Sequence, residues 1–409
     1  MSDARAAARI TTGLFLAHAF GSAGAIAIGT VAAIAGAELS GRTSLAGLPG
    51  AAIQIGGAVA ALAVGLLTER LGRRAGLATA AGVGAAGMIA TVLAAIDGSF
   101  PWILIGLAIA GTASASVKYA RFTAAEVHPR ARRGRAVAIV VMGGTVGSVL
   151  GPLLVAPTGA WSAALGWGEL AGPFLAALAS FVAAALCFAA FLHPEPRELA
   201  ARLEAAGGDP RDLAPARPLR ELARDPGVVT AFVTLVLAQA VMIMVMGITS
   251  LHMHGHDHAL SAISAVFSGH TLGMFAFSLV SGWATDRYGR LPVLGVGGVL
   301  LVVSCLLAPL SPGFLPIFVA LFLLGYGWNL CYVAGSALLA DHLSTAEKAA
   351  TQGVADLALG GVSALATLTG GVIFASFGFA AMSFGGAVGA LALLIVVARY
   401  RSRTPAFAG

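Results

Sequence analysis

The sequence predicts an all-α membrane protein with twelve transmembrane helices in two pseudo-symmetric six-helix halves. Three observations lead to this fold class: the composition, the recurrence of long apolar runs, and the distribution of positive charge. Hydrophobic residues make up 58% of the chain and charged residues only 10%, whereas a soluble domain needs roughly 25% charged residues to cover its surface. A soluble enzyme or a soluble binding domain is therefore excluded.

Apolar runs of about 20 residues, the length that crosses a bilayer, recur along the whole chain. Each run is read as one membrane-spanning helix. We expect these helices near 10–35, 46–67, 76–96, 101–120, 136–156, 170–192, 228–250, 260–284, 292–310, 314–338, 350–376 and 379–398.

The positive charge follows the sides of the membrane. If the N-terminus is cytoplasmic and the spans alternate in direction, 23 of the 24 Lys and Arg residues fall on the cytoplasmic side, and only Arg42 lies outside. Cytoplasmic loops carry such an excess of Lys and Arg. The pattern predicts that both termini are cytoplasmic, and it explains the net charge of +6 without a nucleic-acid partner.

A polar segment, 193–227, divides the chain. It is rich in Pro and charged residues, and we interpret it as a cytoplasmic linker between an N-terminal half, 1–192, and a C-terminal half, 228–409. A short surface helix is expected within it near 197–206, before the helix-breaking pair Gly207–Gly208.

The two halves contain related segments. GLLTERLGRR at 65–74 aligns with GWATDRYGRL at 282–291, at an offset of 217 positions. Both copies fall between the second and third span of their half, on the predicted cytoplasmic side. Internal repeats of this kind are common in secondary transporters. The candidate gating residues in the two copies are Glu69, Arg70, Arg73, Asp286, Arg287 and Arg290.

This repeated pattern resembles the signature of the major facilitator superfamily, and the resemblance covers the whole chain. Glu69 stands where the family usually has Asp, with the charge kept. The resemblance implies the major facilitator fold, a monomeric transporter rather than an enzyme, no resident cofactor, and gating by rocking of the halves. In that scheme the acid caps a helix N-terminus and pairs with Arg. The gating residues carry no information about the substrate.

A second family-like element is Gly147-x-x-x-Gly151-Pro152 on the fifth span. It resembles the Gly-Pro motif of proton-driven antiporters. The alternative is a packing face of small residues followed by a Pro kink.

Methionine and histidine are concentrated in one window. Residues 242–274 hold five of the nine Met and five of the nine His. Met242 and Met246 are four residues apart and share a helix face, from which Met244 points away. His270 and Met274 have the same spacing on the next span. The four residues are expected to form a staggered ladder reaching past the midplane, where facilitator-type substrate sites lie.

These side chains offer thioether and imidazole ligands. Soft thioethers select Cu(I), whereas Zn²⁺ prefers thiolates or several imidazoles. The alternative is packing, because Met fills gaps between helices well, but a buried His within a membrane indicates a functional site. The Met-x-x-x-Met and His-x-x-x-Met pairs also resemble those of the CcoA-type importers, which bring copper into bacterial cells for assembly of cbb3-type cytochrome oxidase. The resemblance implies that Met242, Met246, His270 and Met274 are the copper ligands, in a bacterial inner membrane.

Further candidates surround this set. The outer tract LHMHGHDH offers His252, Met253, His254, His256 and His258 for metal capture, or else is a solvated, pH-sensitive loop. His18 and Gln54 are candidates for the same cavity, and Asp356 is a candidate proton carrier. The roles of Cys187, Cys305 and Cys331, in packing or in metal passage, stay open.

The sequence leaves two alternatives to copper import. One is a proton-coupled efflux transporter of the same fold for small amphipathic compounds. The other is a membrane enzyme or assembly factor that holds copper without moving it, although no Ser/His/Asp set, phosphate-binding loop or haem motif supports an enzyme.

Overall fold

The structure is a computed structural model that describes residues 3–207 and 217–403. Within these ranges every regular element is a helix, as expected from the apolar runs. The helices are α1 Asp3–Ser40, η1 Thr43–Leu45, α2 Leu48–Asp97, α3 Phe100–Glu126, α4 Arg130–Leu153, α5 Val155–Ala164, α6 Ala171–Phe191, α7 Pro196–Gly207, α8 Leu219–Leu222, α9 Pro226–His254, α10 Leu260–Phe275, α11 Ser278–Tyr288, α12 Arg290–Leu307, α13 Phe314–Asp341 and α14 Thr345–Arg403.

Ten helical stretches in the described residues are long and apolar enough to cross a membrane. Two of them contain a glycine with left-handed backbone, Gly72 in α2 (φ 86°) and Gly378 in α14 (φ 80°). A residue with a side chain is strained there, whereas Gly adopts this conformation without cost. Each glycine divides its stretch into two spans. The described residues therefore contain twelve spans, and the predicted fold class is confirmed.

The chain divides into two compact units. Unit 1 comprises Met1–Asp209 and Ala259–Ser268, and unit 2 comprises Pro210–His258 and Gly269–Gly409. The short helix expected near 197–206 is present as α7. The predicted linker runs through residues 208–216, which lie outside the described residues, so the proposed boundaries at 193 and 227 stay a prediction.

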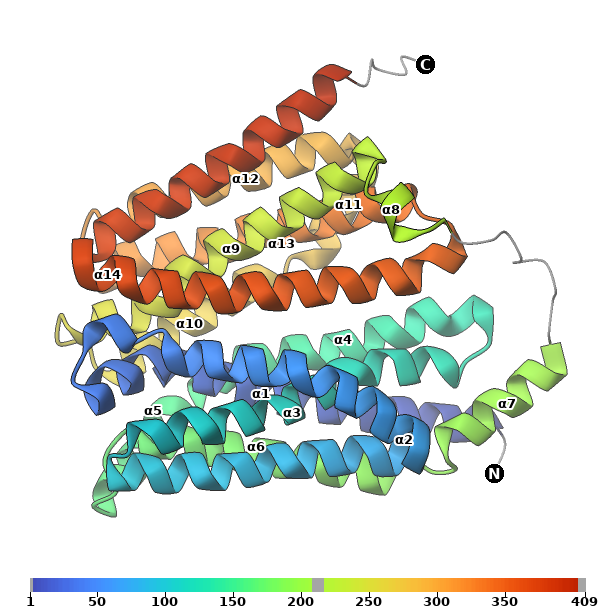
Figure 1. Ribbon diagram of the computed structural model, residues 1–409, viewed down its shortest axis with the longest axis horizontal. Coiled ribbons are helices and arrows are strands. Elements are labelled where there is room, and N and C mark those ends of the chain that lie inside the picture. Colours follow the sequence, from blue (N-terminus) through green and yellow to red (C-terminus); the bar gives the residue numbers. More distant parts are fainter. Residues whose placement is uncertain (1–2, 208–216, 404–409) are drawn as a thin grey trace. The chain divides into compact units, whose positions relative to one another are not determined.

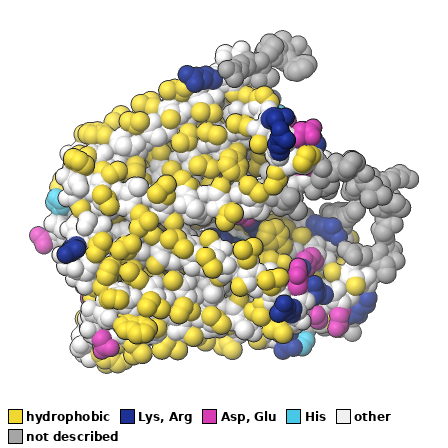
Figure 2. All heavy atoms as spheres, in the orientation of Figure 1, with side chains coloured by type: hydrophobic (Ala, Val, Ile, Leu, Met, Phe, Trp, Pro, Cys, Tyr) yellow, Lys and Arg dark blue, Asp and Glu magenta, His cyan; other side chains and the backbone are white. Residues whose placement is uncertain are grey.

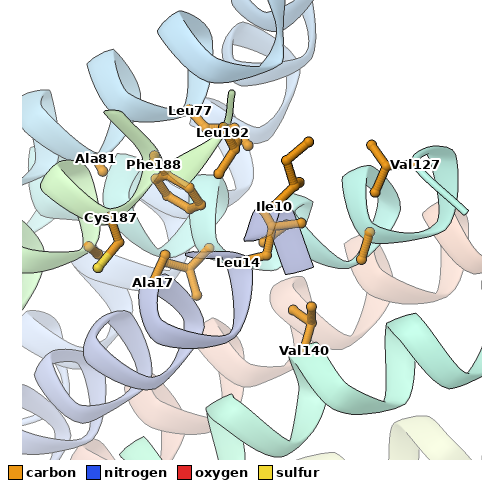
Figure 3. Packing of buried hydrophobic residues seen from close by; sticks show 14 of the residues in the cluster. Ile10, Leu14, Ala17, Leu77, Ala81, Val127, Val140, Cys187, Phe188 and Leu192 are labelled. Carbon is orange, nitrogen blue, oxygen red and sulfur yellow. The ribbon is translucent and has the colours of Figure 1, made fainter. Parts of the chain in front are cut away.

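In unit 1, α1 packs on α4 and α6, while α2 packs on α3 and α6 (Figure 1). Figure 3 shows the apolar cluster that joins these helices, with Ile10 and Leu14 of α1 beside Leu77 of α2 and Phe188 of α6. All four side chains are fully buried. Burial of this kind between helices fixes the scaffold by close van der Waals contact.

The Gly147–Gly151 element on α4 forms part of this packing. A Cβ added to Gly147 or to Gly151 would meet the α1 backbone at Ala19 or Ala23. Pro152 lies inside the last turn of α4, which ends at Leu153. This geometry agrees with a small-residue packing face that ends in Pro, which is the alternative to the antiporter motif for this element.

In unit 2, α9 packs on α14 and α13, and α12 packs on α13 and α14. Two cysteines lie in these contacts. Cys305 lies against Gly386 and Cys331 against Gly297, and both are fully buried. Cys187 of unit 1 is also buried, in the cluster of Figure 3. The three thiols therefore occupy small gaps between packed helices.

Large apolar side chains point outward from the helices. Leu62 on α2 is 79% exposed and Leu279 on α11 is 87% exposed. On the face drawn in Figure 2, hydrophobic side chains cover the flanks of the helices, whereas the charged side chains lie mainly near helix ends. This distribution suits helices whose flanks face lipid and whose ends face water.

Candidate functional site

All four members of the predicted ladder, hereafter the Met/His set, lie in unit 2. Met242 and Met246 belong to α9, and His270 and Met274 belong to α10. Each side chain is buried: His270 completely, and the three methionines at 3% to 8% exposure. The sequence spacing thus places each pair on one helix and away from bulk solvent.

Hydrogen bonding fixes the chemistry of His270. Its Nδ1 lies 2.8 Å from the backbone oxygen of Leu321 on α13. A carbonyl oxygen only accepts, so Nδ1 carries the proton and donates it. Nε2 is then the lone-pair nitrogen of the neutral ring, and this buried atom has no hydrogen-bond partner among the described residues. A buried polar atom without a partner is costly unless a ligand satisfies it.

Glycines bring α10 and α13 close together at this point. A Cβ on Gly325 would collide with the backbone oxygen of His270, and one on Gly273 would lie 2.6 Å from the backbone oxygen of Phe322. The absence of side chains lets the two backbones approach, as small residues do between membrane helices. This close approach places Leu321 within reach of His270.

The helix is interrupted immediately after Phe275, the residue that follows Met274. α10 ends at Phe275 and α11 begins at Ser278. The buried side chain of Asn329 on α13 spans the break: its Nδ2 donates to the Met274 backbone oxygen at 2.6 Å and to Ser278 Oγ at 2.8 Å. The Ser281 hydroxyl donates to Asn329 Oδ1 at 2.5 Å. Discontinuous helices with re-satisfied backbone groups are characteristic of transporter binding sites.

Side-chain contacts of Trp328 connect Phe275 of α10 with Gln239 of α9, the two helices that carry the Met/His set. The Trp328 ring packs edge-to-face on Phe275, next to Met274, with ring centres 6.2 Å apart. Trp328 Nε1 donates to Gln239 Oε1 at 2.9 Å. Gln239 lies three residues before Met242 and seven before Met246, hence on the same side of α9. Gln239 Nε2 also donates to Ser363 Oγ on α14 at 2.9 Å.

Gln239, Trp328 and Asn329 were not among the residues selected from the sequence. The available signal was their polarity within apolar runs, since amide and indole groups require partners when buried. What the sequence could not show is that α13 brings Trp328 to Gln239 and Phe275, and Asn329 to the Met274 backbone oxygen.

Met244 lies on another face of α9. A Cβ on Gly370 would lie 3.4 Å from Met244 Cγ, and one on Gly385 would lie 3.7 Å from its Cε, so Met244 packs against α14. This orientation agrees with the expectation that Met244 points away from Met242 and Met246. It also makes Met244 a natural control residue.

The outer histidine tract is more ordered than the predicted loop. α9 continues to His254 rather than ending near residue 250, so His252, Met253 and His254 are helical. Met253 is fully buried. His258 Nε2 lies 2.8 Å from the backbone oxygen of Pro312. The tract therefore presents its side chains in fixed and different directions.

The additional cavity candidates lie in both units. His18 on α1 and Gln54 on α2 are half-buried in unit 1, and His18 Nδ1 is a buried atom without a partner among the described residues. Asp356 on α14 is half-buried in unit 2. Their participation in one site with the Met/His set stays a prediction.

The two copies of the repeat adopt the same local structure. Gly72 and Gly289 have nearly identical backbone angles, φ 86° and ψ 167° against φ 88° and ψ 164°. Arg73 donates to Glu126 at 2.7 and 2.9 Å, and Arg290 donates to Asp341 at 2.8 Å. The guanidinium after each helix break therefore pairs with a carboxylate near the end of a later helix. Glu69, Arg70, Asp286 and Arg287 are exposed, and Asp286 lies 3.7 Å from Arg290.

Comparison with known proteins identifies the family. The model of the Major Facilitator Superfamily matches residues 14–266 and 231–408, together nearly the whole chain. The chain belongs to the Major Facilitator Superfamily. It is therefore a multi-pass membrane transporter and not an enzyme.

Two relatives match nearly the whole chain. The MFS-type transporter YdeG of Bacillus subtilis, whose own name marks it as uncharacterised, is 34% identical over 95% of this chain and 91% of its own. The riboflavin transporter RfnT of Brucella anthropi is 28% identical over 93% of this chain and 92% of its own.

Solved transporters share the fold at low identity. The xylose transporter XylE from E. coli has a TM-score of 0.67 at 17% identity, covering 98% of this chain and 99% of its own. The nucleoside transporter NupG has a TM-score of 0.68 at 15% identity, covering 97% and 98%. Their different substrates indicate that the fold alone does not select the cargo.

Proposed function

We propose that this superfamily transporter is a copper importer of a bacterial inner membrane that works by alternating access, as a monomer with cytoplasmic termini. The observation that carries the proposal is the free Nε2 lone pair of His270, buried without a partner among the described residues, on the same helix face as the Met274 thioether. Imidazole and thioether ligands without a carboxylate favour a soft monovalent ion over Zn²⁺, Mg²⁺ or Ca²⁺.

The surroundings of the set suit a cargo site. The Leu321 carbonyl holds the His270 ring in one tautomer, in the manner of the outer-shell partners of metal-bound imidazoles. The helix break at residues 276 and 277, held by Asn329, lies directly after Met274 and Phe275. A site next to a helix break can change when the helices tilt, which lets a transporter release its cargo. Delivery of the copper to cbb3-type oxidase assembly follows only from the resemblance to the CcoA-type importers.

The decisive experiment is radioactive copper uptake in copper-limited cells at matched expression. We expect His270→Ala and Met242→Leu to reduce uptake about tenfold or more, because each removes a metal ligand. Met244→Leu is the matched control, since Met244 packs against α14 and should leave uptake unchanged. Protein-dependent uptake that survives His270→Ala would overturn the proposal.

A second candidate is import of a planar aromatic molecule such as riboflavin. It rests on the full-length similarity to RfnT and on the aromatic pair beside the Met/His set, where Trp328 stacks on Tyr332 at 4.8 Å between ring centres. Aromatic faces stack favourably on flat rings. Rescue of a riboflavin auxotroph that persists in His270→Ala but fails in Trp328→Leu would favour this candidate over copper.

The efflux alternative has no comparable support. The Gly147–Gly151 element that suggested it packs against α1, which accounts for the small residues without proton coupling.

A further inference from the structure

The C-terminal end of α9 holds a pair of imidazoles outside the Met/His set. His252 and His256 are four residues apart, and their ring centres lie 4.4 Å apart at an interplanar angle of 64°. Two imidazoles that share one ion at about 2 Å from each nitrogen have ring centres roughly 4 to 5 Å apart. The two rings meet edge to face at a separation within that range, which is compatible with a shared ion.

Both rings are held in place by the fold. The His252 ring stacks on Phe379 at 4.0 Å with an interplanar angle of 1°, and its edge contacts Phe374. His256 Nδ1 lies 2.8 Å from the backbone oxygen of His252. Because this oxygen accepts only, Nδ1 is the donor, and Nε2 is the nitrogen whose lone pair is available to an ion. The same tautomer is fixed in His270 by Leu321.

The backbone of the turn is also ordered. The amides of His256 and His258 both donate to the backbone oxygen of Met253, at 3.0 and 3.2 Å. Asp257 adopts a left-handed conformation, φ 61°, which Asp tolerates in tight turns. This turn carries His258 to the Pro312 carbonyl. His258 is therefore the matched control for the pair.

We propose that His252 and His256 form a binding site for a divalent first-row transition ion, with Cu²⁺ bound most tightly. Two neutral imidazole nitrogens suit Cu²⁺ and its neighbours, and Cu²⁺ leads the series in affinity. A helix C-terminus favours a cation, and the exposure of His256 leaves room for water to complete the coordination. Thioether ligands take no part, so this site differs in chemistry from the buried Met/His set.

The pair lies beyond the end of that set. His252 follows Met246 by six residues, roughly 9 Å along the helix axis. Because the proposed pair is defined by its own geometry, it does not depend on the proposed copper transport. The two proposals are tested separately. Ion binding to purified protein tests the His252–His256 pair, and copper uptake in cells tests the proposed transport.

The test is Cu²⁺ binding to the full-length protein in lipid nanodiscs, measured by chelator competition and by electron paramagnetic resonance. We expect a bound ion with hyperfine coupling to imidazole nitrogens. His252→Ala and His256→Ala should each weaken binding about tenfold or more, while His258→Ala leaves this site unchanged. The proposal is overturned if His256→Ala keeps the affinity and spectrum of the unaltered protein, or if His258→Ala loses as much.

Folding of the variants does not obscure this result. His256 is exposed, so its substitution removes a ligand without opening the apolar interior. The stacking of His252 on the buried ring of Phe379 makes His252→Ala the more disruptive change. His256→Ala, with its thermal unfolding measured alongside, is therefore the deciding variant.

Discussion

At the scale of single residues, the position of His270 depends on a residue without a side chain. Gly325 lets α13 approach the His270 backbone, and Leu321, one turn earlier on α13, then accepts the imidazole hydrogen bond. A glycine in a helix is normally a disadvantage of about 1 kcal/mol relative to Ala. Its presence here is explained by the space that the two backbones require.

This explanation predicts the effect of Gly325→Ala. The new Cβ would collide with the His270 oxygen, so we expect a loss of about 1–3 kcal/mol from overpacking, despite the better helix propensity of Ala. Thermal unfolding of the purified protein measures it. Gly295→Ala on α12, where a Cβ meets nothing within 4 Å, is the control. An unchanged unfolding temperature in Gly325→Ala would show that α10 and α13 are not held by this contact.

At the scale of elements, one ion-pair cluster ties three helix ends of unit 2 together. Arg217 donates to Glu347 near the start of α14 at 2.7 Å and to the His342 carbonyl after α13 at 2.7 Å, and lies 3.7 Å from Asp225, the N-cap of α9. Glu347 also accepts the backbone N–H of Ser344 at 2.8 Å. Through Arg217, the cluster connects the segment that precedes α9 to the ends of α9, α13 and α14.

The cluster predicts a pH dependence of stability. The hydrogen bonds from the Arg217 side chain, and then from backbone amides, hold the pKa of Glu347 far below its ordinary value of 4.5. The unfolded chain therefore binds this proton more readily than the folded one, so the stabilisation is complete above about pH 4.5 and declines as the pH falls further. We expect the unfolding temperature of the protein to fall as the pH is lowered below about 4.5.

Glu347→Gln separates this contribution from that of other carboxyl groups. The variant should be less stable than the unaltered protein at pH 7 and should show a smaller further loss on acidification. Equal pH slopes for the two proteins would mean that Glu347 contributes nothing to the acid sensitivity.

At the scale of the whole molecule, the two halves repeat one arrangement with different burial. Arg73 is 12% exposed and contacts Glu126, Tyr119 and Thr68, whereas Arg290 is 32% exposed and pairs with Asp341, itself 46% exposed. Exposed ion pairs contribute little, while removing one partner of a buried pair leaves an uncompensated charge. The two copies of the repeat thus share their geometry, and we expect the less exposed Arg73–Glu126 pair, at 12% and 31%, to contribute more to stability than the Arg290–Asp341 pair.

This asymmetry predicts different outcomes for matched substitutions. Arg73→Gln should lower stability by about 2 kcal/mol or more, and Arg290→Gln by less than about 1 kcal/mol. Chemical or thermal unfolding in one detergent compares the two variants directly. Equal losses, or a larger loss for Arg290→Gln, would contradict the difference in burial as the cause.

Much of the fold could be predicted because a bilayer restricts the sequence severely. The twelve spans follow from the length and hydropathy of the apolar runs. The repeat follows from the matching residues at 65–74 and 282–291. The extension of α9 to His254 and the break after Phe275 could not be predicted. The polarity of each segment does not differ from that of the residues beside it. Of the candidate site, the sequence indicated Met242, Met246, His270 and Met274 by their spacing, and these stay a prediction. It did not indicate Gln239, Trp328 or Asn329.

The sequence by itself therefore determined the membrane class, the number of spans and the helix faces that carry the Met/His set. These features depend on residues within one or two helical turns and on the thickness of the hydrocarbon layer. Only the tertiary structure decided which nitrogen of His270 is free and which two histidines of the outer tract face each other. Leu321, which binds His270, lies 51 residues further along the chain. Phe379, which stacks on His252, follows the α14 kink at Gly378. Only folding brings these residues into contact.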